Sequence, residues 1–75
     1  MKDFDKSLDT TGLNSPIPIL RVKKELIEMV EGEILKVIAT CETALVDFEA
    51  FCKQNSYSLH SSKDTNGVYT FFISK

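Results

Sequence analysis

The stretch GLNSPIP at residues 12–18, followed by ILRVKK at residues 19–24, decides how this chain is organised. Gly12 gives the backbone the conformational freedom that a tight turn needs. Pro16 biases Ser15 towards the extended dihedral angles of an N-cap residue, and Pro16 itself suits the first position of a helix. The stretch therefore predicts a turn that leads into a helix, with Ser15 as the N-cap at the positive end of the helix dipole.

Apolar residues recur at helical spacing after this turn and predict a helix from about Pro16 to Val30. Charged side chains occupy its other face, and Glu31-Gly32 is a typical helix end. The apolar positions of this helix are Ile19, Val22, Leu26, Met29 and Val30, and Leu20 and Ile27 widen the apolar stripe.

The rest of the chain predicts one more helix and four short strands. The nearly continuous apolar run in residues 33–40 is typical of a central strand, and Thr40 is the expected N-cap of a second helix over about residues 41–54. Alternating patterns and the hairpin signal Asn66-Gly67 predict the remaining strands, at residues 5–10, 56–61 and 68–74.

These elements predict an α/β protein, a two-layer α/β sandwich of order βαβαββ. Two helices should pack on one face of a four-stranded mixed sheet. The first two strands should be parallel through a right-handed crossover, and the last two should be antiparallel.

Length and charge limit the classes of function. The chain has 75 residues, enough for a single domain over residues 1–75, and 43% of them are apolar. A net charge of −2 gives no basic surplus for phosphates, which weighs against nucleic acid as a partner. No apolar run is long enough to span a membrane, and the N-terminal residues do not resemble a signal peptide, so a cytoplasmic location is expected.

The two cysteines, Cys41 and Cys52, match no zinc or redox spacing. Both fall in the predicted second helix, about three turns apart, which is too far for a disulfide within the helix. Cys52 is expected to be a small core residue. Cys41 continues the apolar stripe, which favours a structural role, but a thiol in a first helical turn can also be activated.

No set of residues predicts a self-contained enzyme. His60 is the only histidine, and its place in a predicted strand favours an exposed residue over a metal ligand or a base. A nucleophile–base–orienter set, a metal cluster and a glycine-rich phosphate loop are all missing from the sequence, so neither a cofactor nor a metal is expected.

The segment LDTTGLNSPIP at residues 8–18, with the basic pair Lys23-Lys24, resembles the signature of the TusA (SirA-like) family of small bacterial sulfur-carrier proteins. That signature reads Leu-Asp, two residues, Gly-Leu, one residue, Cys-Pro, one residue, Pro, with basic residues further on. The resemblance extends from about Leu8 to Ser74 and implies the same two-layer fold. It makes Gly12, Leu13, Pro16 and Pro18 the site loop, and it places the family's sulfur-carrying cysteine on Ser15.

The resemblance implies a persulfide relay. The cysteine accepts sulfur from a cysteine desulfurase or another donor and passes it to a downstream acceptor protein. Because a hydroxyl cannot hold a persulfide, the chain is expected to be inactive as given, and Cys41 is the other thiol suited to sulfur chemistry. Ser15 is either the residue of a relative that has lost the chemistry or a replacement that removes a reactive thiol.

The alternative function is a non-catalytic protein-binding or regulatory module on the same fold. Under either function Arg21, Lys23 and Lys24 could form a docking patch beside the motif. They could equally be a solvated helix face, with Lys24 near Glu28. The alternative predicts that Ser15→Cys gains no sulfur-accepting activity.

Overall fold

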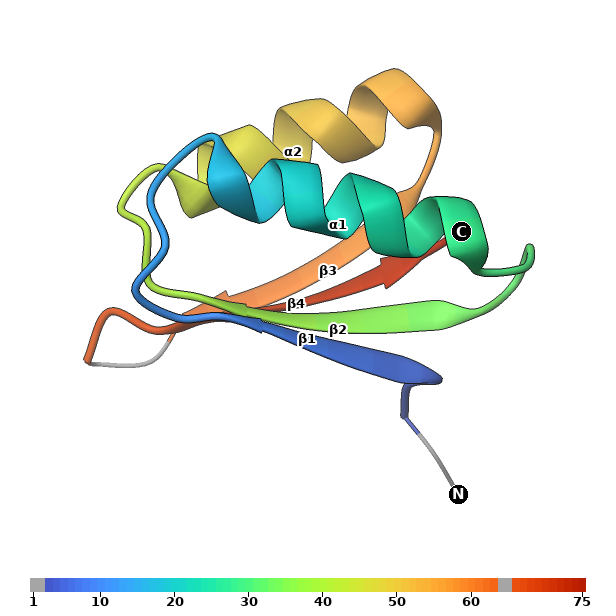
Figure 1. Cartoon of the computed structure of the whole chain (residues 1–75), viewed down its shortest axis with the longest axis horizontal. Helices are drawn as coiled ribbons and strands as arrows, with labels where there is room; N and C mark the ends of the chain where they lie inside the picture. Colours follow the sequence, from blue (N-terminus) through green and yellow to red (C-terminus); the bar gives the residue numbers. More distant parts are fainter. Residues whose placement is uncertain (1–2, 64–65) are drawn as a thin grey trace.

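The computed structural model of the chain describes residues 3–63 and 66–75. Its element order confirms the predicted βαβαββ succession (Figure 1). The elements are β1 (Lys6–Thr10), α1 (Ile17–Glu28), β2 (Ile34–Ala39), α2 (Ala44–Asn55), β3 (Ser58–Lys63) and β4 (Tyr69–Ser74).

The strands form one four-stranded mixed sheet in the order β1-β2-β4-β3. β1 and β2 are parallel, with Leu8 opposite Val37, as the crossover rule predicts. β4 runs antiparallel to both of its neighbours, β2 and β3, which confirms the predicted hairpin. The hairpin signal Asn66-Gly67 lies in the connection between β3 and β4, and residues 64 and 65 of this connection lie outside the described residues.

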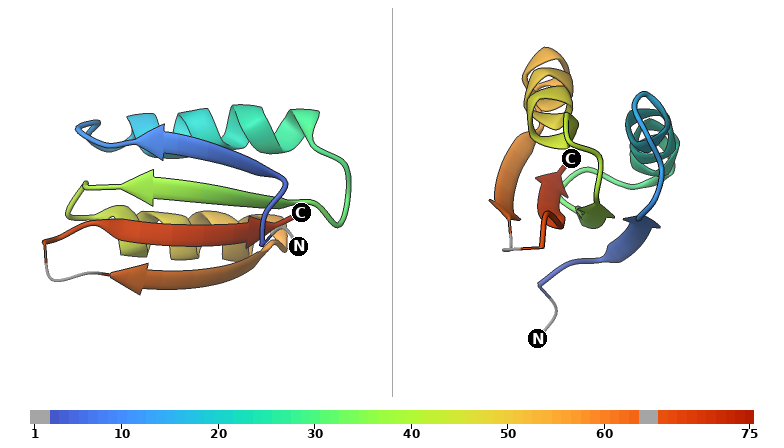
Figure 2. Two further views of the ribbon diagram at one scale, coloured as in Figure 1. Left: turned by 90° about the horizontal axis from the view of Figure 1, so that it is seen from below. Right: turned by 90° about the vertical axis from the view of Figure 1, so that its left-hand side faces the viewer.

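The helices form a second layer on one face of the sheet, as predicted (Figure 2). Buried and half-buried residues alternate along β2 and β4 because successive side chains point to opposite faces of a strand. The buried set of each strand faces the helices. On the other face, Phe4 packs against Phe72 of β4 with ring centroids 6.4 Å apart.

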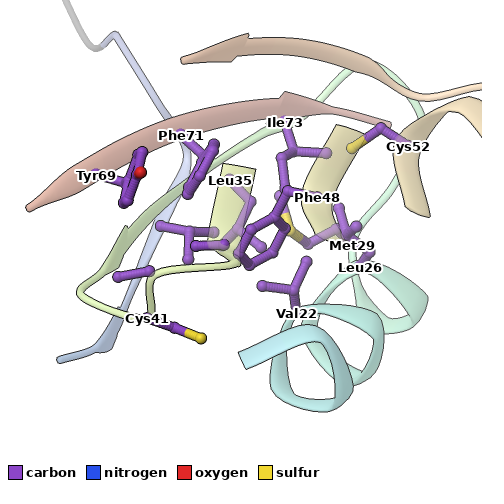
Figure 3. Packing of buried hydrophobic residues seen from close by; sticks show 13 residues of the cluster. Val22, Leu26, Met29, Leu35, Cys41, Phe48, Cys52, Tyr69, Phe71 and Ile73 are labelled. Carbon is purple, nitrogen blue, oxygen red and sulfur yellow. The ribbon is translucent and has the colours of Figure 1, made fainter. Parts of the chain in front are cut away.

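The core lies between the two layers (Figure 3). Phe48 of α2 packs on Phe71 of β4 with ring centroids 4.5 Å apart, and both side chains are fully buried. Val22 and Leu26 bring α1 to the same cluster. Burying each large apolar side chain of this kind contributes roughly 1.5–3 kcal/mol relative to leaving it exposed.

The helix boundaries correct the sequence-based prediction at two places. α1 ends at Glu28, so Val30, which was expected in its apolar stripe, lies beyond the helix and is exposed. α2 begins at Ala44 with Thr43 as its N-cap, not at residue 41. The amide of Ala44 donates to the carbonyl of Cys41 over 3.0 Å, so Cys41 belongs to a separate turn before the helix.

Two further features bear on function. None of the helices among the described residues combines the length and the apolar character needed to cross a membrane. Within the same residues, no group of three or more His, Cys, Asp or Glu side chains lies in an arrangement that could hold a metal ion. His60 is an exposed residue of β3, as expected.

Candidate functional site

Two connections meet at one end of the sheet. The loop of residues 11–16 leaves the carboxyl end of β1, and the turn of residues 40–43 leaves the carboxyl end of β2. Because β1 and β2 are parallel, both connections emerge at the same edge (Figures 1 and 2). This edge is where open α/β sheets commonly place their functional residues.

Hydrogen bonds from both neighbouring segments hold the first loop. The amide of Leu13 donates to the carbonyl of Thr10 over 3.1 Å, which closes a turn around Gly12. Gly12 has a φ of +82°, in the left-handed region that favours glycine, as the sequence predicts. Its amide donates to the Thr40 hydroxyl oxygen over 2.9 Å and so ties the loop to the β2–α2 turn.

Asp9 fixes the start of the loop. Its carboxylate accepts the Thr11 hydroxyl and also the Thr11 amide, the latter over 2.9 Å. These two bonds stabilise the charged form and lower the pKa of the Asp9 carboxyl below its ordinary value. The Leu-Asp pair of the motif therefore has a structural role in shaping the turn.

Ser15 is exposed on this loop but does not cap α1, so the N-cap prediction is wrong. The N-cap residue is Pro16, which has no side-chain acceptor, and the Ser15–Pro16 peptide bond is cis. The amide of Ile17 already donates to the carbonyl of Asn14 over 2.9 Å, and Pro18 has no amide hydrogen to offer. The first turn therefore leaves the Ser15 hydroxyl without the amides that a cap would use.

The motif residues divide into exposed and buried ones. Ser15 and Pro16 are exposed, whereas Pro18 is buried and Leu13 is half-buried. The buried members anchor the loop, and Ser15 is left at the surface. The members of the predicted site loop therefore differ in their structural tasks.

A cavity of about 500 Å³ brings Ser15 and Cys41 together. It lies between the two connections and is lined by Asn14, Ser15, Thr40, Cys41, Glu42 and Thr43. No local sequence pattern indicated this proximity, because the predicted second helix would have placed Cys41 in its first turn. The signal available was topological, since parallel strands bring both connections to one edge.

Cys41 has hydrogen-bonding partners that favour its thiolate. Its Sγ lies 3.3 Å from Oγ1 of Thr43. Hydrogen bonds from the Thr43 side chain and backbone, and a weaker one from the Ser15 backbone, lower the pKa of the Cys41 thiol below its ordinary value. Burial and the charge of Asp47 act in the opposite direction without reversing the shift. The residue is 9% exposed, and it is open to the cavity.

The environment of Cys52 shifts the pKa of its thiol in the opposite direction from that of Cys41. It is buried on α2, at the other end of the core cluster from Cys41 (Figure 3). Burial raises the pKa of the Cys52 thiol to about 11, which makes it a poor nucleophile near neutral pH. Its predicted core role is confirmed by this burial.

The three basic residues of the predicted docking patch are exposed on α1. Arg21 and Lys24 line a second cavity of about 440 Å³, together with Leu8, Leu20 and Glu25, and Lys23 lines neither this cavity nor the one beside Ser15. The prediction that Leu20 and Ile27 belong to the apolar stripe of this helix is wrong, because Leu20 is 54% and Ile27 is 67% exposed. Ile17 at the start of the helix is also 41% exposed.

The site presents one exposed loop residue, Ser15, and one thiol, that of Cys41, beside a cavity at the surface of the protein. Such an arrangement suits a side chain that meets the active site of another protein.

Comparison with known proteins agrees with this geometry. Residues 6–75 match the family model described as Sulfurtransferase TusA. The chain is 49% identical to the sulfur carrier protein TusA of Allochromatium vinosum, over 100% of this chain and 99% of that protein. It is 46% identical to a putative sulfur carrier protein of Neisseria meningitidis serogroup A, over 91% and 92% of the two chains.

A solved structure has the same fold. The SirA-like protein from Desulfitobacterium hafniense superposes with a TM-score of 0.85 at 25% identity, covering 93% of this chain and 96% of that chain. The family match over nearly the whole chain, the two relatives and the shared fold lead to one conclusion: this chain belongs to the TusA family of sulfur-carrier proteins.

Proposed function

We propose that this protein is a sulfur carrier of the TusA type in which the sulfur-carrying position is occupied by Ser15, so that residue 15 itself holds no sulfur. The observation that carries the proposal is the exposure of Ser15 on a loop held by the sheet edge and by Thr40. A side chain held there can enter the active site of another protein without any rearrangement of the core.

The chemistry of the relay requires a thiolate at this point. A thiolate at position 15 would attack the terminal sulfur of a donor's persulfide, form a new sulfur–sulfur bond and release the donor's cysteine as a thiolate. The serine hydroxyl has a far higher pKa than a thiol and forms no stable oxygen–sulfur analogue of a persulfide. Replacing sulfur by oxygen at this one atom therefore removes the step and leaves the loop in place.

The partners are a sulfur donor, such as a cysteine desulfurase, and a downstream acceptor protein. Arg21, Lys23 and Lys24 supply exposed positive charge on the helix that follows the loop. They would guide a partner with an acidic rim around its own cysteine. No membrane and no nucleic acid is required.

The proposal is tested with a protein that has a single thiol, Ser15→Cys/Cys41→Ser/Cys52→Ser. It is incubated with a cysteine desulfurase and cysteine without reductant, and its intact mass is measured. The matched control is Cys41→Ser/Cys52→Ser, which has no thiol. The variant should gain the mass of one sulfur atom, removed again by dithiothreitol, and the control should gain none.

The alternative of a non-catalytic binding or regulatory module makes the opposite prediction. If the single-thiol variant gains no sulfur while a TusA relative does so from the same desulfurase, the sulfur-carrier proposal is wrong. Circular dichroism verifies that the single-thiol variant is folded before its mass is compared with that of the TusA relative.

A further inference from the structure

Cys41 lies inside the candidate site and not merely near it. The cavity that Ser15 lines is also lined by Cys41, and the two residues come from separate connections at the same sheet edge. A donor that brings its persulfide to the loop therefore brings it to a cavity that already contains a thiol.

We propose that Cys41 is a sulfur-accepting residue of this protein, at which a donor persulfide can deliver its terminal sulfur although position 15 is a serine. The inference rests on the proposed function, because it uses the same partner, the same cavity and the same kind of sulfur. It assigns a different atom as the acceptor.

The step balances without an added oxidant or reductant. The Cys41 thiolate attacks the terminal sulfur of a donor cysteine persulfide, and a bond forms between Sγ of Cys41 and that sulfur. The sulfur–sulfur bond of the donor breaks, and the donor's cysteine leaves as a thiolate. The proton of the Cys41 thiol passes to water, and the new persulfide keeps the oxidation level of the old one.

The neighbours of Cys41 suit this role. The Thr43 hydroxyl lies 3.3 Å from the sulfur and also reaches Asp47, to which it donates over 2.8 Å. When the thiol loses its proton, the hydroxyl can turn from the carboxylate to the thiolate. Cys41 thus has a local donor for its charged form, whereas burial of Cys52 disfavours the thiolate there.

The arrangement also explains how a nearly buried thiol can react. The Cys41 side chain is 9% exposed, so it presents sulfur at the wall of the cavity and not on an outer surface. The cavity of about 500 Å³ is open to the surface, and the terminal sulfur of a donor's persulfide is small enough to reach Cys41 through it. We therefore expect slower sulfur transfer to Cys41 than to a cysteine at the exposed position 15.

The experiment compares the unaltered protein with Cys41→Ser and with Cys52→Ser. Each is incubated with a cysteine desulfurase and cysteine without reductant, alkylated with iodoacetamide to trap the persulfide, and analysed by intact mass and peptide mapping. The unaltered protein and Cys52→Ser should each carry one added sulfur, mapped to Cys41. Cys41→Ser should carry none.

Two results would overturn the inference: no added sulfur on the unaltered protein, or an added sulfur that maps to Cys52. Peptide mapping of the unaltered protein keeps the test valid even if Cys41→Ser folds poorly. The single-thiol variant with a cysteine at position 15 separates the two proposals. If it gains sulfur and the unaltered protein does not, Cys41 is not an acceptor and the proposed function stands. If only Cys41 gains sulfur, the assignment of position 15 is wrong.

Discussion

The Thr40 side chain accepts a hydrogen bond from the backbone amide of Gly12 over 2.9 Å. This bond joins the loop that carries Ser15 to the turn that carries Cys41. This side chain is thus one of the links between the two halves of the candidate site. We expect its removal to loosen the site without disturbing the core.

Thr40→Val tests this link, because valine keeps the shape of threonine and removes the hydroxyl. We expect a loss of about 0.5–1.5 kcal/mol in the free energy of unfolding, the usual net value of one hydrogen bond. The amide of Gly12 should exchange its hydrogen faster. Thr40→Ser keeps the hydroxyl and is the matched control. Unchanged exchange at Gly12 in Thr40→Val would contradict the role of this bond.

Ser15→Ala tests the finding that Ser15 is not an N-cap. Because the N-cap is Pro16 and no side-chain cap bond is present, the free energy of unfolding should change by less than about 0.5 kcal/mol. Loss of a genuine serine cap costs about 1 kcal/mol. Chemical denaturation distinguishes the two values. A loss of about 1 kcal/mol or more in the free energy of unfolding would show that Ser15 does cap the helix.

The two thiols should differ in their reaction with iodoacetamide as the pH rises. Only the thiolate reacts, so a lowered pKa lets Cys41 react at a lower pH than an ordinary cysteine. Cys52, with a pKa of about 11, should stay nearly unreactive at pH 8. Peptide mapping of the alkylated protein over a pH series measures both.

Substitutions of the neighbours of Cys41 test whether each neighbour raises or lowers the pKa of the Cys41 thiol. Thr43→Val removes a donor to the thiolate and should move the alkylation midpoint of Cys41 to higher pH. Asp47→Asn removes an opposing charge and should move it to lower pH. Glu42, the acidic residue that lines the cavity, is kept in both variants. Equal rates for Cys41 and Cys52 in the unaltered protein would refute the assigned environments.

Charge reversal tests the docking role of the basic residues on α1. In the single-thiol variant with a cysteine at position 15, Arg21→Glu/Lys23→Glu/Lys24→Glu should slow sulfur uptake from the donor by about tenfold or more at low salt. The difference should shrink as salt screens the charges. Lys53→Glu, at the far end of α2, is the control. Equal rates for the two variants at low salt would show that these residues are a solvated face.

The regular elements could be predicted from the sequence because their signals are local. The apolar run of β2 and the spacing of Val22 and Leu26 depend only on near neighbours, and right-handed crossover then determines the parallel pairing. The family motif also identified the exposed loop around Ser15.

The two features that the sequence-based prediction placed wrongly, the turn at Cys41 and the end of α1, depend on contacts between distant segments. The separate turn at Cys41 is read as helix because its apolar spacing continues that of α2. The end of α1 likewise depends on Lys75, whose ammonium donates to the carbonyls of Leu26 and Met29 where the last turn has no basic residue. No local sequence pattern predicts that Lys75, which follows β4, donates hydrogen bonds to the end of α1. Likewise, none predicts the cavity that Ser15 and Cys41 share.

The most direct test of the central claim is the intact mass of the single-thiol variant Ser15→Cys/Cys41→Ser/Cys52→Ser after incubation with a cysteine desulfurase and cysteine. A gain of one sulfur atom, reversed by dithiothreitol and absent from Cys41→Ser/Cys52→Ser, is the predicted result. An unchanged mass of the folded variant, under conditions in which a TusA relative takes up sulfur, would contradict the account.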